Sequence, residues 1–476
     1  MIKIVYSEYI GEKVLSWLLI LITVFSWFIF PLMAKQLYPS VFLLGFSIFL
    51  FLVSIVVAIT LSRNQLALQP LHKMMIVCWI GYLLALLLAT LESGSTYSLA
   101  QWCILSAKFL FFAFLLLYMN VKYIVATLRI YANLMVVTVI LAFVAVIAVA
   151  AGVHPLTTVD LGGRLADVYF GAYYVLNTSI CMPAPIYRIQ GLSEEAGTYA
   201  FALLPAFFWL VMAEKAYVRS AVIVLGLMLS MSLGAGLLLL LLLPIMVIKY
   251  RIADYKVPAF FMCAICVIGL MYVASGSCTN RYFENIENAL MLPEDKTMAS
   301  EDKAMSPEFK SMAADVNACE KGGVGRRECI AAFKGSLSTS LSGKAHSFQD
   351  RLDGLCAAYS YLKAHPIGTG MALGMQTVHN SISVGYAVAV LEAGVVGGVL
   401  YLCFFSIMGW LALKTIITTN IGSFEGQVKI VVALSVCAVL TMGAQRIQPD
   451  LSFWHMWIYA MWFYLLQKLP CFKVAP

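Results

Sequence analysis

The sequence predicts an all-α, polytopic membrane protein, and two observations carry this prediction. Of the 476 residues, 62% are hydrophobic and only 12% are charged, whereas soluble domains usually carry about a quarter charged residues. The apolar residues also gather in blocks of about 17 to 25, the length that a helix needs to cross about 30 Å of hydrocarbon. Outer-membrane barrels are excluded, because their strands alternate polar and apolar residues and contain no run such as Leu237 to Ile248.

About twelve blocks qualify as spans. The first, Val14 to Met33, is long enough to cross the bilayer and is not followed by a small-residue cleavage site, so we interpret it as a span and not as a signal peptide. The predicted spans lie near residues 14–33, 40–62, 72–91, 97–119, 131–152, 197–213, 217–233, 235–250, 257–275, 383–411, 428–444 and 451–468.

Basic residues cluster at one side of this topology, and the positive-inside rule identifies that side as the cytoplasm. Both termini then lie in the cytoplasm. The net charge of +7 reflects this topology and does not indicate nucleic-acid binding. The basic residues in question are Lys3, Lys13, Arg63, Lys73, Lys122, Arg129, Lys215, Arg219, Lys249, Arg251, Lys256, Lys414, Lys429, Lys468 and Lys473.

Two long segments remain on the outer side, and loops of such length normally carry function. They divide the chain into residues 1–275, which hold nine spans and the outer segment 152–197, a large outer loop at 276–382, and three last spans at 383–476. No internal repeat is visible.

The large outer loop is expected to be partly helical. Apolar residues recur at helical spacing over 350–364, which predicts an amphipathic helix able to lie along the membrane surface. His365-Pro366 ends it, and glycines at 368, 370 and 374 supply a flexible turn. Of the five outer cysteines, Cys319 and Cys329 are the favoured disulfide pair, although connectivity is not fixed by sequence.

Two arginines at the outer surface are candidates for binding a diphosphate. Arg188 lies just ahead of the sixth span, and Arg351 begins the predicted amphipathic helix. A guanidinium group stays protonated and grips phosphate oxygens with two parallel hydrogen bonds. The alternative is that each arginine only reaches the headgroup layer or pairs with a nearby carboxylate.

His379 is the histidine whose position best suits a general base. It stands at the mouth of the tenth span beside Asn380, and a neutral imidazole there would accept a proton from a sugar hydroxyl. A purely structural histidine is the alternative interpretation.

Three glutamates form a separate group. Glu392 lies inside the tenth span, where an ionisable group is a functional candidate by default, although a helix-packing role with the nearby glycines is equally compatible. Glu194 and Glu195 precede a helix N-terminus, where their charge is stabilising without any catalysis.

Other chemistries lack a motif. The sequence contains no HExxH, paired CxxC, Walker A or GxSxG pattern, and Gly162-Gly163-Arg164 alone is too weak to define a site. An enzyme acting on the outer side without nucleotides needs another activated donor, and a lipid-linked diphosphate supplies one.

The order of these motifs resembles the O-antigen polymerase and O-antigen ligase superfamily, over about residues 188–405. The motifs are Arg188 followed by Gly-Leu-Ser-Glu-Glu-Ala-Gly, a large outer loop, Arg351-Leu-Asp, Pro366-Ile-Gly-Thr-Gly, His379-Asn380-Ser381 and Glu392-Ala-Gly-Val-Val-Gly-Gly. The resemblance implies a GT-C-like, metal-independent and inverting glycosyltransferase of the bacterial inner membrane with its active site in the periplasm. It needs no cofactor.

In this interpretation the outer arginines, Arg188 and Arg351, bind the donor diphosphate and His379 activates the acceptor. Donor and acceptor are both oligosaccharides linked to undecaprenyl diphosphate, and a chain-length regulator is a further candidate partner. The remaining substrate-binding candidates are Glu194, Glu195, Asn380, Arg164 and Tyr187.

We therefore expect an O-antigen, or related surface polysaccharide, polymerase. An O-antigen ligase or a protein O-oligosaccharyltransferase would use the same donor with another acceptor. A lipid-linked oligosaccharide flippase is the alternative from another class, and it would be expected to show several buried charges and two related halves.

Overall fold

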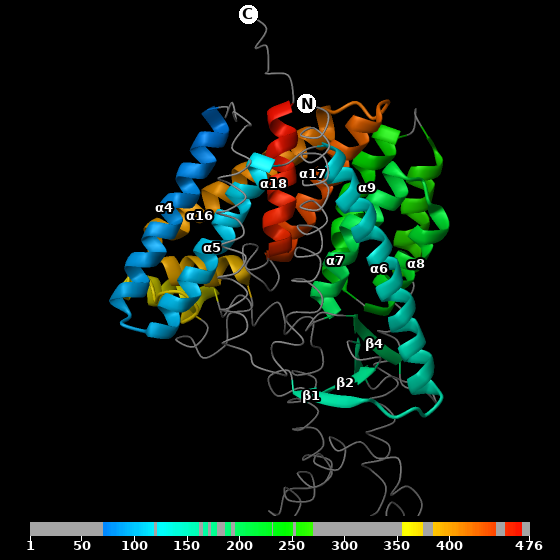
Figure 1. The fold of residues 1–476 in the computed structure, drawn as a ribbon, viewed down its shortest axis with the longest axis horizontal. Helices are drawn as coiled ribbons and strands as arrows, with labels where there is room; N and C mark the ends of the chain where they lie inside the picture. Colours follow the sequence, from blue (N-terminus) through cyan, green and yellow to red (C-terminus); the bar gives the residue numbers. More distant parts are fainter. Residues whose placement is uncertain are drawn as a thin grey trace, which may run out of the picture.

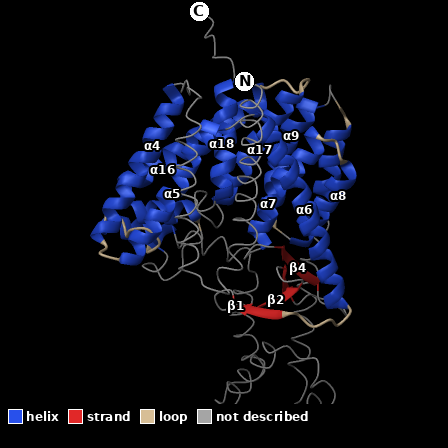
Figure 2. Ribbon diagram, in the orientation of Figure 1, coloured by secondary structure: helices blue, strands red, loops and turns tan. Residues whose placement is uncertain are grey.

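The computed structural model describes residues 70–118, 121–160, 165–169, 173–178, 186–191, 196–230, 232–250, 254–269, 355–374, 384–443 and 453–468. Within these ranges the chain forms a bundle of apolar helices with a small sheet at one end (Figure 1; Figure 2). We call this the sheet end, and we call the opposite end, where α7 leads into Glu214, the Glu214 end.

Ten helices occupy the positions of ten predicted spans. They are α4 (Pro70–Glu92), α5 (Thr96–Tyr118), α6 (Val121–Ala150), α7 (Ala196–Phe208) with the π-helical turn η1 (Trp209–Ala213), α8 (Tyr217–Ser230), α9 (Leu233–Tyr250), Lys256–Gly269, α16 (Gly385–Thr418), α17 (Phe424–Gly443) and α18 (Phe453–Lys468). Within the described ranges, five segments are long and apolar enough to cross a membrane: Lys73–Glu92, Ile124–Val149, Ala196–Ala213, Gly385–Thr418 and Phe424–Gly443. The chain is thus a helical, multi-pass membrane protein. The predicted spans 14–33 and 40–62 lie outside the described residues, and the total of twelve stays a prediction.

The expectation of an all-α chain is wrong for the outer segment 152–197. This segment contains an antiparallel sheet whose strand order, β1-β2-β3-β4, follows the sequence. Its strands are β1 (Thr157–Asp160), β2 (Leu165–Tyr169), β3 (Tyr173–Thr178) and β4 (Ile186–Gly191). Its strands are rich in tyrosine, valine and threonine, residues that favour extended backbone.

The core has two halves that meet at α17. On one side α4 packs along α16 through an aromatic cluster, in which the rings of Trp79 and Phe404 are 4.7 Å apart and those of Tyr82 and Tyr401 are 4.6 Å apart. On the other side α7 is enclosed by α6, α8, α9 and α17. Almost every residue of α7 is buried, as expected for a helix that is apolar on all faces.

Large apolar side chains on the outside of the bundle are numerous. Those on α4 and α6 include Val77, Leu84, Leu88, Val137 and Val144, all at least 40% exposed. A soluble monomer rarely exposes so large an apolar surface. These faces are therefore suited to contact lipid.

Candidate functional site

Most of the residues that the sequence nominated for chemistry lie outside the described residues. This holds for Arg164, Glu194, Glu195, Arg351, His379 and Asn380, and also for the favoured disulfide between Cys319 and Cys329. The structure therefore neither unites nor separates the proposed catalytic group of Arg188, Arg351 and His379. Among the outer cysteines, Cys356 is described and is a free thiol.

Tyr187 and Arg188 belong to β4, where Tyr187 pairs with Asn177 and Arg188 with Leu176 of β3. Ile189 is fully buried in the main core. Since successive residues of a strand alternate between its faces, position 188 belongs to the face of the sheet opposite to Ile189.

Gly191 fixes how β4 joins the bundle. Its φ of +56° is strained for any residue with a side chain, and a β-carbon there would overlap the ring of Tyr199 on α7. The hydroxyl of Tyr199 lies 3.0 Å from Oγ1 of Thr138 on α6. The arginine-bearing strand is thus held against two membrane helices by close packing at a glycine.

The second outer segment with candidate residues, 351–380, is described over residues 355–374, and this part lies at the same end of the bundle (Figure 1). Residues 355–364 are helical, which confirms the helix predicted over 350–364 for its described part, while its predicted position along the membrane surface stays a prediction. Ala358 is buried, together with Leu391 of α16, and Tyr361 and Leu362 pack against them. Leu355 and Tyr359 are exposed and form an apolar face away from the bundle.

After this helix the chain interlocks with a break in α16. Gly394 has a φ of +73°, which interrupts the helix within the membrane. The amide of Val395 donates to the carbonyl of Pro366 at 2.9 Å, a partner from outside its own helix. We call this junction of residues 366–370 with residues 391–395 the α16 interlock.

The interlock satisfies the carbonyls that the break releases. The amide of Thr369 donates to the carbonyl of Leu391, and the amide of Gly370 donates to the carbonyl of Glu392, both at 3.1 Å. An unpaired backbone group in hydrocarbon costs several kcal/mol, so these hydrogen bonds allow α16 to be discontinuous. Discontinuous helices at membrane depth commonly mark functional sites.

The carboxylate of Glu392 lies at this break. Its residue is 2% exposed, and a β-carbon added to Gly374 would be 3.0 Å from its Cγ and 3.5 Å from its Oε1. Glu392 is the eighth residue of α16, about 10 Å along the helix from its first residue. The buried carboxylate and the chain that continues toward His379 are therefore close together.

The helix-packing interpretation of the Glu392 segment has structural support. The glycines do permit close helix packing, because a β-carbon on Gly397 would lie 2.9 Å from Cβ of Ala85 on α4. Gly394 serves the helix break instead. The sequence pattern did not reveal this break, although three glycines in the Pro366 segment and three after Glu392 were a possible signal for close backbone contact.

The side chain of Thr90 on α4 links the interlock to α4 and α5. Oγ1 of Thr90 accepts a hydrogen bond from the amide of Met371 at 3.1 Å and lies 3.5 Å from Oγ of Ser98. Both hydroxyl residues are buried. Three regions distant in the sequence, namely the corner between α4 and α5, residues 366–374 and the break in α16, thus meet at the sheet end.

Searches of protein-family models, curated proteins and solved structures found no match to this chain.

Proposed function

We propose that the protein is a glycosyltransferase that polymerises a surface polysaccharide, with an undecaprenyl diphosphate-linked glycan as its donor. The observation that best supports this proposal is that the two outer segments with candidate catalytic residues join the bundle at the same end. β4, with Arg188, is seated on α7, and residues 366–374, which lead toward His379, are seated on α16 (Figure 1). This end would face the periplasm of the bacterial inner membrane.

The reaction assigned to this end is a single displacement. A hydroxyl of the lipid-linked acceptor sugar attacks the anomeric carbon of the donor glycan, and the bond from that carbon to the diphosphate breaks. His379 takes the hydroxyl proton, and Arg188 and Arg351 neutralise the departing diphosphate. Fixed charges of this kind are often the largest contribution to catalysis, and the anomeric configuration inverts.

The α16 interlock supports this proposal by its position. Gly374 precedes His379 by five residues in the sequence, and residues 366–370 are anchored on α16 by backbone hydrogen bonds. Catalytic groups must be held to within about 0.5 Å of a productive geometry. An anchor this close along the chain helps to provide such a constraint.

The test is replacement of each arginine by alanine in the intact membrane protein. Arg188→Ala and Arg351→Ala should abolish long-chain polysaccharide while the amount of protein in the membrane stays unchanged. Lys73→Ala, which removes an exposed cation of α4, is the control and should leave the chain-length ladder normal. Normal ladders from both arginine variants would refute the assignment.

A ligase that uses the same donor is distinguished by the phenotype of a deletion strain. Loss of a polymerase leaves lipid A-core that carries a single repeat unit, whereas loss of a ligase leaves lipid A-core without any.

The discontinuous helix α16, with its buried carboxylate, is the observation that favours a transporter as the second candidate, since such helices form the sites of many transporters. An assay of the purified protein in detergent, where no membrane separates two compartments, distinguishes a transferase from a transporter. Polymer formed there from added lipid-linked repeat units would exclude a function limited to transport.

A further inference from the structure

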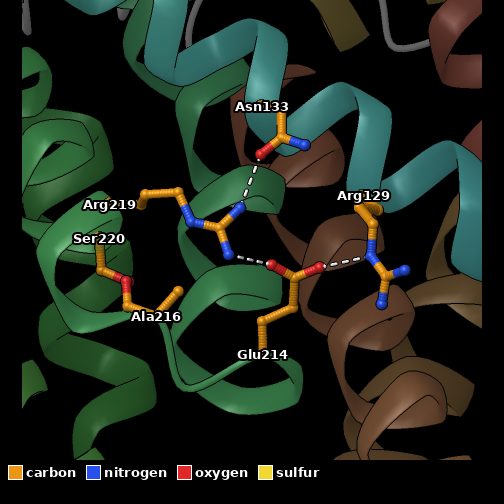
Figure 3. A network of polar contacts seen from close by, with 6 residues as sticks. All are labelled: Arg129, Asn133, Glu214, Ala216, Arg219 and Ser220. Carbon is orange, nitrogen blue, oxygen red and sulfur yellow. Dashed lines mark hydrogen bonds and ion pairs between the residues drawn. The ribbon is translucent and has the colours of Figure 1, made fainter.

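At the Glu214 end, far from the proposed active site, one carboxylate gathers two arginines from different helices (Figure 3). Nε of Arg129 on α6 donates to Oε1 of Glu214 at 2.7 Å, and Nη2 of Arg219 on α8 donates to Oε2 at 2.6 Å. Nη1 of Arg219 also donates to Oδ1 of Asn133 at 2.7 Å. We call these four residues the Glu214 cluster.

The Glu214 cluster carries one positive charge in excess, because two guanidinium groups face one carboxylate. Burial of that carboxylate raises its pKa, but the hydrogen bond from Arg129 and the charge of Arg219 outweigh burial and leave the pKa below its ordinary value. The adjacent Lys215 pairs with Asp254 at 3.0 Å and adds no net charge. Among the described residues, no further anion pairs with the two arginines.

Arg129 has hydrogen-bonding capacity to spare. Its side chain is 57% exposed, and among the described residues only its Nε has a partner. Figure 3 shows both terminal nitrogens turned away from Glu214. A planar pair of N–H groups held in this way matches the oxygens of a phosphate.

The exposed surface next to Arg129 is an apolar column of α6. Asn133, Val137, Leu141 and Val144 follow Arg129 at intervals of four, four, four and three residues, so they share one face of the helix. Val137, Leu141 and Val144 are 49%, 37% and 40% exposed. They belong to the membrane-crossing segment Ile124–Val149, where an exposed apolar face would contact acyl chains.

We propose that the Glu214 cluster binds the phosphate of an anionic phospholipid, whose acyl chain lies along Val137, Leu141 and Val144. The terminal nitrogens of Arg129 hold the phosphate, and Arg219 contributes its charge. The apolar column makes a lipid the ligand in preference to free phosphate, since inorganic phosphate gains nothing from those side chains. Glu214 acts by holding the two guanidinium groups in place.

Native mass spectrometry of the full-length protein in detergent, with phosphatidylglycerol or phosphatidylcholine added, tests this proposal. The wild type should retain phosphatidylglycerol, and Arg129→Gln should reduce retention at least about tenfold, the loss that corresponds to one charge-assisted hydrogen bond. Arg219→Gln should also reduce it. Val137→Ser should weaken retention while leaving the arginines intact.

Lys73→Gln is the matched control, because it also removes one exposed cation but from α4, and its retention should equal that of the wild type. Glu214→Gln keeps a carbonyl acceptor for the guanidinium groups and raises the excess charge of the cluster, so this variant should retain at least as much lipid. If Arg129→Gln fails to fold because Glu214 loses a partner, the double variant Arg129→Gln/Glu214→Gln removes both charges and should still lose the lipid.

Three outcomes would overturn the proposal. The first is unchanged retention in both arginine variants, and the second is an equal loss in Lys73→Gln, which would indicate only general charge attraction. The third is displacement of phosphatidylglycerol by inorganic phosphate at equal concentration, which would assign the site to free phosphate. None of these measurements depends on transferase activity.

Discussion

The α-carbon of Gly394 lies so close to the carbonyl of Ile367 that a β-carbon would overlap it. Gly394→Ala should therefore break the α16 interlock. The positive φ alone costs about 1 to 3 kcal/mol, and the overlap adds to that cost. We expect a clear loss of thermal stability in detergent and, if the proposed function holds, loss of polysaccharide formation.

Gly94→Ala is the control for this variant, since Gly94 has a φ of +63° with nothing within 4 Å of its added β-carbon. Gly94→Ala therefore measures the cost of a positive φ for alanine without any overlap of the new methyl group. Equal destabilisation by the two substitutions would show that the overlap at Gly394 adds nothing, and would contradict the claim that the interlock stabilises the protein.

Thr90→Val tests the link between α4 and the interlock. The substitution keeps the size of the side chain but leaves the amide of Met371 without its acceptor, which costs about 1 to 3 kcal/mol for a buried group. Thr90→Ser keeps the hydroxyl and should be much closer to the wild type. Thermal unfolding of the three proteins measures the difference, and identical midpoints for valine and serine would show that the hydrogen bond is unimportant.

Gly191→Ala should displace β4 from α7, because the new methyl group would enter the ring of Tyr199. In the proposed function this moves Arg188, so polymer length should fall even where protein remains in the membrane. Gly152→Ala supplies the comparison, since Gly152 also has a positive φ, +77°, but open space around it. A wild-type polysaccharide ladder from Gly191→Ala would argue against a role for this strand.

The Glu214 cluster should make stability depend on pH in the acidic range. The native pKa of Glu214 lies below its ordinary value of 4.5, so its contribution is complete above that value and is lost as the pH falls through the native pKa. The difference in thermal midpoint between the wild type and Glu214→Gln should thus be largest above pH 4.5 and shrink below it. A difference that grows on acidification would contradict the assigned sign.

Hydropathy predicted the positions of the described helices well, but it did not predict all of their first and last residues. α6 begins at Val121, ahead of the expected residue 131, because Lys122 and Arg129 read as loop residues. Arg129 can remain in a membrane helix because it pairs with Glu214, a partner 85 positions away that no local pattern reveals. Likewise α16 reaches Thr418 instead of residue 411.

The sheet and the interlock were missed for different reasons. The strands around Tyr173 and Ile186 carry aromatic and β-branched residues, a signal that was present in the sequence. The break at Gly394 was not predictable from its own segment, since Glu-Ala-Gly-Val-Val-Gly-Gly fits a continuous packed helix. The break depends on hydrogen bonds between α16 and residues 366–370, a segment that lies earlier in the chain. Glu392 was recognised because an acidic residue in an apolar block is conspicuous.

The interlock is built from main-chain atoms, and this gives it an unusual pattern of tolerance to mutation. Ile367 and Val395 are 50% and 47% exposed although both belong to the interlock, where the amide of Val395 donates to the carbonyl of Pro366. Positions 367 and 395 should therefore tolerate many different side chains, while Gly368 and Gly394 should accept no replacement. Divergent sequences with the same junction would then share little beyond the spacing of their glycines, which makes such a site hard to detect by ordinary sequence comparison.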